Sequence, residues 1–347
     1  MDLHRGVVLS FALAALSVAC GLEPTTGTRA TPITEIIGDP AGPGASVTDQ
    51  VSVKSYDLAQ CDEAPSAERR VEVCRRWHCD GRGASEAAQW AGDPAACNAG
   101  DLDPRAAERA LRLVNVHRWL AGLDPVASEA SWTAAAQGCA LVAHANKRLS
   151  HTPGRDWQCW SDEAALASQV SLIANRSASN AVLPFFEDPG NEETMVHRRW
   201  LLAEELSTVG FGSTDRYTCI VVAGSELDRA KGKSTASPEA PAGARGWSAW
   251  PPAGPVPIDV FTSERLDTMG WTVQSSSVGL EAAEVTVTED GTPRPVRVSK
   301  LTPNQGSRSA LRFVPDGWTT QAGRTYAVSV RGKIEIDFSV EPVDCAP

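Results

Sequence analysis

Hydrophobic positions recur with two different periods along the chain. From residue 104 to about residue 202 they lie three and four apart, the spacing that places them on one face of an α-helix. Asp103-Pro104 supplies an N-cap and a proline at the first helical position, and Gly122 ends that helix. Further helices are predicted over about 128–147, from Ser161, over about 178–186 and from Asn191 to Leu202, and a strand is predicted over 217–222.

Beyond Trp247 apolar residues alternate with polar residues instead. A period of two is typical of strands with one buried face, and turn residues separate the alternating runs. Residues 225–246 carry Ala, Pro, Gly, Ser and charged residues without an apolar pattern, so we predict a linker there. We expect a β-sandwich over 247–347, with strands in the segments 284–288, 295–298, 310–314, 326–330 and 334–338.

The N-terminus carries the features of an export signal. Arg5 precedes an apolar run that is too short to span a membrane, so residues 1–19 are predicted to be a signal peptide. The run ends Ser17-Val18-Ala19-Cys20, which resembles a bacterial lipobox and implies lipidation of Cys20. The alternative is an ordinary cleaved signal that leaves Cys20 as a free thiol. Residues 20–55, rich in Gly, Pro, Thr and Ser, are predicted to be a lipidated flexible tether.

Cysteine usage agrees with export. The chain has nine cysteines, and eight remain when Cys20 is set aside. An even number in an exported chain suggests four disulfides, although sequence does not fix the pairing. Four of the eight lie in residues 56–103, which we predict to be a disulfide-rich extension; Cys74 and Cys79 could instead form a metal knuckle. The disulfide candidates are Cys61, Cys74, Cys79, Cys97, Cys139, Cys159, Cys219 and Cys345.

Length and charge limit the partners. A chain of 347 residues is long enough for two domains, and its formal net charge of −11 argues against a nucleic-acid partner. The expected partners are a membrane, through the lipid anchor, and an unidentified extracellular ligand. Gly21 after Cys20 is not the inner-membrane retention signal of the aspartate type, which favours the outer membrane or cell surface.

Several short motifs occur in order between residues 105 and 224. They are Asn115 and Arg118 before Gly122-Leu123-Asp124-Pro125, then Ser150-His151-Thr152, Ala181-Val182 before Phe185-Phe186, His197-Arg198-Arg199-Trp200-Leu201-Leu202, and Val209-Gly210-Phe211-Gly212. In this order and spacing the chain resembles the CAP superfamily of cysteine-rich secretory, antigen 5 and pathogenesis-related-1 proteins, also called the SCP domain. The resemblance implies an α+β protein with a three-layer α-β-α sandwich over 104–224. The segment from Trp247 more weakly resembles a β-rich companion of CAP domains in larger bacterial proteins.

The resemblance also implies a site. In the wider family two histidines and two acids line a central cavity that can hold a divalent metal, often zinc. His151 and His197 match the histidines, and Asp188, with Glu187 beside it, matches one acid. The other acid is missing, because residues 167–172 contain no carboxylate, and Val196 replaces the usual glycine before the second histidine. These four side chains are the predicted cavity residues, and whether a metal binds His151 and His197 stays open.

Three classes of function follow. The leading hypothesis is a non-enzymatic envelope protein that binds a lipid, glycan or peptide in the CAP groove. The second is a metal-dependent hydrolase or peptidase that uses His151, His197 and Asp188, with an open zinc position for water. The chain lacks both a His-Glu-x-x-His helix and a Gly-x-Ser-x-Gly elbow. The third is a structural or adhesion module of the cell envelope, in which the β-domain makes the contacts.

The other conspicuous polar residues are expected to have ordinary roles. His78, His117 and His144 are predicted to be surface or structural residues, with His117 one step round the helix from the apolar face. Arg198 and Arg199 are expected to form surface ion pairs, or to pair with Asp188 or an anionic ligand.

Overall fold

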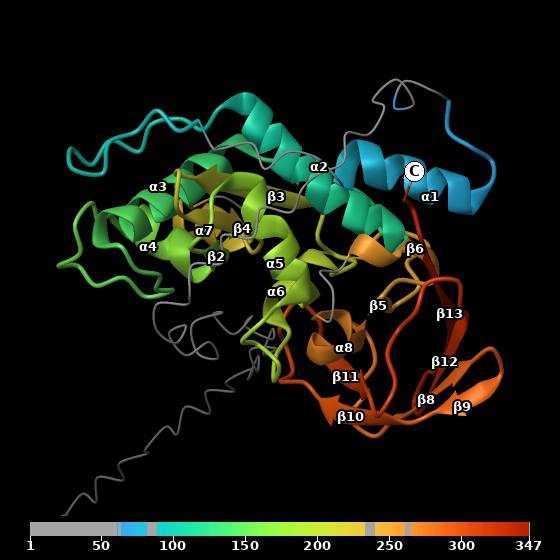
Figure 1. The fold of residues 1–347 in the computed structure, drawn as a ribbon. Coiled ribbons are helices and arrows are strands. Elements are labelled where there is room, and N and C mark those ends of the chain that lie inside the picture. Colours follow the sequence, from blue (N-terminus) through green and yellow to red (C-terminus); the bar gives the residue numbers. More distant parts are fainter. Residues whose placement is uncertain (1–60, 62–63, 82–88, 233–239, 261–264, 347) are drawn as a thin grey trace, which may run out of the picture. The chain divides into compact units, whose positions relative to one another are not determined.

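The computed structural model describes residues 61, 64–81, 89–232, 240–260 and 265–346 (Figure 1). The predicted signal peptide, Cys20 and the tether lie outside these residues. No helix within the described ranges is long and apolar enough to cross a membrane.

A mixed sheet forms the middle layer of the region that resembles a CAP domain. Its strand order is β1-β3-β4-β2, where β1 runs parallel to β3 and the other neighbours are antiparallel. The strands are β1 (Ala127–Ser128), β2 (Ser171–Ala174), β3 (Thr208–Ser213) and β4 (Thr218–Val221). The helices are α2 (Pro104–Leu120), α3 (Ala130–Asn146), α4 (Asp162–Gln169), the 3₁₀ turn η4 (Ala178–Ala181), α5 (Val182–Glu187) and α6 (Val196–Leu201).

The two faces of this sheet are buried in different apolar clusters. Leu172 and Ile220 pack in a cluster with residues of α2, whereas their neighbours Ile173 and Val221 pack in a cluster with alanines of α3 and α4. Successive strand residues point to opposite faces, so helices cover both sides of the sheet. This arrangement confirms the predicted α-β-α fold.

The glycines of the Val-Gly-Phe-Gly motif let α3 approach β3 closely. A Cβ atom on Gly210 would lie 2.3 Å from the carbonyl carbon of Trp132, and one on Gly212 would lie 2.2 Å from that of Ala136. Both positions therefore need a residue without a side chain, and the motif is a packing requirement of this fold.

The C-terminal region contains two further sheets. One has the order β10-β11-β7-β5 and is antiparallel; the other has the order β6-β13-β12-β8-β9 and is antiparallel except between β6 and β13. The strands are β5 (Ser248–Trp250), β6 (Gly254–Pro257), β7 (Trp271–Ser275), β8 (Glu284–Glu289), β9 (Thr292–Arg294), β10 (Val296–Lys300), β11 (Ser309–Pro315), β12 (Tyr326–Arg331) and β13 (Glu335–Val343). Trp271, Phe313, Tyr326 and Val328 are buried in their shared core. The predicted sheet-rich C-terminal region is confirmed.

Some element boundaries differ from those predicted. The segment expected to be a linker begins with helix α7 (Ser225–Ala230), because Leu227 is buried in the cluster under α3 and α4. The helix predicted from Asn191 begins only at Val196, after a turn. Two short helical segments precede β7, η5 (Ile258–Val260) and α8 (Arg265–Met269).

All eight candidate cysteines are paired, which confirms four disulfides and fits an exported protein. Cys139–Cys219 ties α3 to β4, and Cys97–Cys159 ties the extension to the loop before α4. The metal-knuckle alternative for Cys74 and Cys79 is wrong, since the two residues pair with Cys345 and Cys61 respectively.

The disulfide-rich extension is linked to the C-terminal end of the chain. It contains α1 (Arg69–Arg76), followed by a turn of π-helix, η3 (Trp77–Gly81). Figure 1 shows α1 beside the C-terminus, and Cys74 is joined there to Cys345. His78 Nε2 lies 2.6 Å from the Cys345 carbonyl oxygen, and Arg70 pairs with Glu341 of β13 at 2.6 Å.

His117 is a core residue rather than a surface one. Its side chain is fully buried, its ring stacks on Phe186 at 4.1 Å between centroids, and Trp77 and Trp250 pack around it. Nδ1 lies 2.6 Å from the Leu113 carbonyl, so Nδ1 carries the proton and donates it. The helical spacing missed this burial because the extension and β5 cover a second face of α2.

Burial of His117 predicts a loss of stability in acid. Desolvation lowers its pKa from 6.5 to about 4 although the Leu113 carbonyl opposes the shift. Between these values the unfolded chain binds a proton that the folded protein does not, so stability is complete above pH 6.5 and falls towards pH 4. The shift corresponds to roughly 3 kcal/mol. Urea unfolding at pH 7 and pH 4.5 should show that His117→Phe loses about that much less stability on acidification; equal losses in both proteins would refute the assignment.

Candidate functional site

Asp188 and His197 form the centre of the predicted site. Asp188 follows α5 and is fully buried, and His197 lies in the first turn of α6 with 13% of its side chain exposed. The His197 Nδ1–H donates to Asp188 Oδ1 at 2.7 Å. Asn191 donates to the same oxygen from Nδ2 at 3.0 Å. An aspartate in this position fixes the tautomer of the imidazole, so Nε2 is left as the acceptor nitrogen.

The same carboxylate starts helix α6. Asp188 Oδ2 accepts the backbone N–H groups of His197 at 3.0 Å and of Arg198 at 3.2 Å. These N–H groups lack partners within the helix, so Asp188 takes the role of an N-cap from outside the helix. Asn191, at which the sequence predicted the start of this helix, accepts the N–H groups of Thr194 and Met195 with its carbonyl oxygen.

The backbone around this pair is strained. Asp188 has φ +61° and Met195 has φ +47°, both in the left-handed region that residues other than glycine seldom adopt. Strain of this kind costs about 1–3 kcal/mol per residue and concentrates at sites where geometry serves a function. Here it fixes the two ends of the segment that orients His197.

His151 follows α3 and is anchored to α4. Its side chain is buried, and Nδ1 donates to the Ser168 carbonyl of α4 at 2.8 Å. The contact anchors the end of α3 to α4. His151 Nδ1 is thus held by a backbone carbonyl, whereas His197 Nδ1 is held by the carboxylate of Asp188.

Glu187 faces a different part of the molecule from its neighbour. Its side chain is buried, with an oxygen 3.4 Å from Nη1 of Arg265 at the start of α8. Asp188 is therefore the acid that contacts His197, and Glu187 contributes a contact between the CAP region and the C-terminal region.

The Asp188 carboxylate is occupied by protein donors rather than open to a metal ion. Both oxygens of Asp188 already accept hydrogen bonds, four in all. Among the described residues no group of three or more His, Cys, Asp or Glu side chains could hold a metal. Zinc prefers four ligands, of which at least three come from the protein in catalytic sites. Metal binding by His151 and His197 stays a prediction without support from this geometry.

Arg198 and Arg199 are structural residues, and the expectation of surface ion pairs is wrong. Both are buried and both bind carbonyl groups. Arg198 donates to Phe186 O at 2.6 Å and to Gly270 O at 2.8 Å. Arg199 donates to Thr302 O at 2.6 Å and to Ser307 O at 3.0 Å. Burial lowers the pKa of Arg198 to about 10 and that of Arg199 to about 9, so both stay cationic at neutral pH.

Arg118, which belongs to the motif that begins with Asn115, is a structural residue as well. Its guanidinium is fully buried and donates to four carbonyl oxygens at 2.7–3.0 Å. Those oxygens belong to Asp124, Leu201, Ala203 and Leu206. Asn115, one turn earlier, exchanges two hydrogen bonds with the backbone of Val126. These side chains hold the loops after α2 and α6, which position the histidine segment.

The comparisons with known proteins agree with this fold. Residues 111–221 match the sequence model of the cysteine-rich secretory protein family (CAP). Together with the α-β-α layers and the motif residues, this match shows a CAP domain in this part of the chain. None of the curated proteins compared with the chain matches it.

One solved structure also aligns with the chain. It is the crystal structure of an extracellular protein containing a SCP domain from Bacillus anthracis str. Ames, with 18% identity and a TM-score of 0.27 over 35% of this chain. The chain covers 43% of that protein, less than half its length. The CAP identification rests on the family match and on the fold described above.

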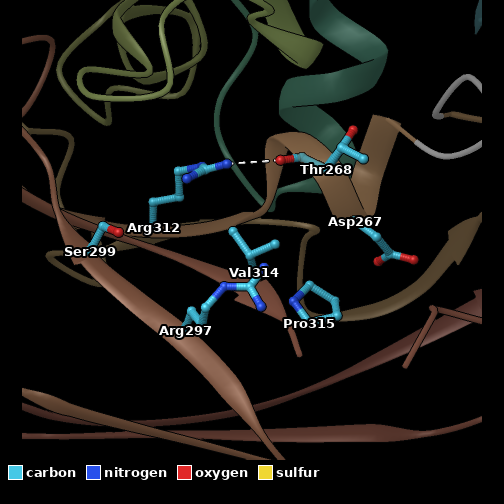
Figure 2. A pocket seen from close by; sticks show the side chains of 7 residues that line it. All are labelled: Asp267, Thr268, Arg297, Ser299, Arg312, Val314 and Pro315. Carbon is cyan, nitrogen blue, oxygen red and sulfur yellow. Dashed lines mark hydrogen bonds between the residues drawn. The ribbon is translucent and has the colours of Figure 1, made fainter. Parts of the chain in front are cut away.

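A pocket of about 520 Å³ lies in the C-terminal region, and sequence analysis did not anticipate it (Figure 2). None of the four predicted cavity residues lines it. Arg297 and Arg312 lie on its wall, from β10 and β11. Alternation along the strands placed both side chains on the face away from the core, but the sequence does not give the register that brings them together.

Proposed function

We propose that the chain is an exported, membrane-anchored CAP-domain protein that acts without catalysis and binds an extracellular lipid, glycan or peptide in the CAP groove. The four disulfides support export. The predicted lipidation of Cys20 supports the anchor, with the outer membrane or cell surface as its location.

The proposal rests mainly on the hydrogen bonding and packing of the His197 ring. Asp188 occupies Nδ1, and in the described part of the chain Nε2 has no hydrogen-bond partner. The ring packs against Phe185 at 4.8 Å between centroids. An acceptor nitrogen beside an aromatic surface suits a ligand with an apolar body and a hydroxyl or amide donor. The buried aspartate and the strained backbone hold this nitrogen in place before a ligand arrives.

Native mass spectrometry of the protein purified from an exporting host tests this proposal. We expect a co-purifying small molecule on the wild-type protein and its loss from His197→Gln, because glutamine cannot place the acceptor held by Asp188. His144→Gln is the matched control, since His144 also faces an aspartate, Asp215 at 3.3 Å, with 15% of its side chain exposed. Retention of the ligand by His197→Gln would contradict the proposal.

A hydrolase is the second candidate, and the Asp188–His197 pair is the observation that favours it. An aspartate that orients a histidine is the supporting half of a catalytic triad. The third member is a nucleophile bonded to Nε2, and among the described residues no serine, threonine or cysteine makes that bond. The ligand-binding proposal needs only the groups that are in place.

A further inference from the structure

The pocket in the C-terminal region is built on the outer face of strands β10 and β11. Their register pairs Arg297 with Val314 and Ser299 with Arg312. Directly opposed side chains on one face have Cβ atoms about 5 Å apart, and diagonal neighbours are about 7–8 Å apart. Arg297 and Arg312 are such a diagonal pair, so their long side chains can reach one bound group. Helix α8 closes the pocket on the other side with Asp267 and Thr268 (Figure 2).

Arg312 is fixed in position before any ligand binds. Its Nε donates to the Met269 carbonyl at 2.5 Å and its Nη2 donates to the Thr268 carbonyl at 2.8 Å, both at the end of α8. Figure 2 shows the second bond as a dashed line between Arg312 and Thr268. Within the described chain the third nitrogen, Nη1, has no partner.

The polar groups that remain available in this pocket are donors. Arg297 uses Nη1 for Asp316, an exposed acid, and keeps its other N–H groups. The Ser299 hydroxyl has no partner among the described residues. Asp267, the acid on the wall, is already engaged, because its two oxygens accept the N–H and hydroxyl of Thr320 at 2.8 and 2.6 Å.

The charges of Arg297 and Arg312 also favour an anionic ligand. Burial lowers the pKa of Arg312; Glu192 opposes that shift, and the positive charge of Arg297 adds to it. The two guanidinium groups therefore repel each other across the pocket. An anion between them would remove this repulsion and accept the unused N–H groups.

We propose that this pocket binds a phosphate or sulfate ester of a sugar-sized molecule. The ester oxygens would lie between Arg297, Ser299 and Arg312, and the rest of the ligand would cover Val314 and Pro315. The volume of about 520 Å³ supports an ester rather than a free ion, since it falls within the range of small-molecule sites. His197 does not line this pocket. A negative result for the pocket would therefore leave the proposed ligand binding at His197 unaffected, and the reverse also holds.

Calorimetric titration of the mature, disulfide-bonded chain at fixed ionic strength tests the pocket. The probes are glucose 6-phosphate, inorganic phosphate and glucose. We expect glucose 6-phosphate to bind more tightly than inorganic phosphate and glucose not to bind. Arg297→Gln should weaken glucose 6-phosphate binding roughly tenfold or more, because one of two charge-assisted contacts is lost. Arg297 is 64% exposed, so the variant should keep the wild-type melting temperature.

Arg331→Gln is the matched control. Arg331 also lies on an exposed strand position, with 45% of its side chain exposed, and it pairs with Asp337 at 2.7 Å. It should bind glucose 6-phosphate like the wild type. The proposal is overturned if glucose 6-phosphate does not bind at millimolar concentration, if glucose or inorganic phosphate binds equally well, or if Arg297→Gln and Arg331→Gln behave alike.

Discussion

Removing the Cys74–Cys345 disulfide is expected to release the extension and to cost about 5 kcal/mol of stability. The bond joins residues 271 apart in sequence, so it restricts the unfolded chain more than any other of the four disulfides. It also holds the hydrogen bond from His78 to the Cys345 carbonyl. Denaturant unfolding of Cys74→Ser/Cys345→Ser measures the loss, and limited proteolysis should cut the variant between α1 and α2.

Cys97→Ser/Cys159→Ser is the control for this prediction. That bond closes a segment of 62 residues, and it lies away from the contacts of α1 with the C-terminus. Its removal should destabilise the protein less and should leave α1 protected from proteases. Equal protection of α1 in both double variants would show that the Cys74–Cys345 bond does not hold the extension.

Arg199→Met is the second change with a large expected effect, about 4 kcal/mol. The substitution leaves two carbonyl oxygens without their donor, that of the buried Ser307 and that of the partly buried Thr302, and each such loss costs about 1–3 kcal/mol. Arg199→Lys should recover less than half of the stability, because an ammonium cannot match the planar guanidinium. Hydrogen exchange should accelerate in residues 301–308, which Arg199 anchors to α6.

Arg112→Met provides the comparison for that change. Arg112 is half-exposed on α2 and lies 3.8 Å from Glu108, so its replacement should alter stability by less than about 0.5 kcal/mol. Arg199 does not connect α6 to residues 301–308 if Arg199→Met loses as little stability as Arg112→Met, or if hydrogen exchange in residues 301–308 is unchanged.

The sequence predicted the helices and strands of the fold better than the partners of its buried polar side chains. Period-3.6 and period-2 patterns follow directly from which face of a helix or strand is buried, so α2, α3 and the alternating strands could be located. Arg198 and Arg199 could not be placed, because each also donates to a carbonyl group more than 70 residues away. The signal in the sequence was their position in a short helix beside the apolar residues Val196, Trp200 and Leu201.

The candidate site was predicted in part. Motif order located Asp188 and His197, which the structure joins by a hydrogen bond. It also grouped His151 with them, and that grouping stays a prediction; His151 Nδ1 is bound to the Ser168 carbonyl. A motif gives residue types in order but not the competing backbone partners of each ring. Arg297, Ser299 and Arg312 could not be grouped from the sequence, because their proximity depends on the strand register, which alternation alone does not supply.

We propose above all that Asp188 and His197 form a binding site that works without a metal. The most direct test is the native mass of the full mature chain, compared with the masses of His197→Gln and His144→Gln. We expect a small organic molecule on the wild-type and His144→Gln proteins and none on His197→Gln. One zinc ion per wild-type chain that is lost in His197→Gln would contradict this proposal and would favour the metal-dependent hydrolase.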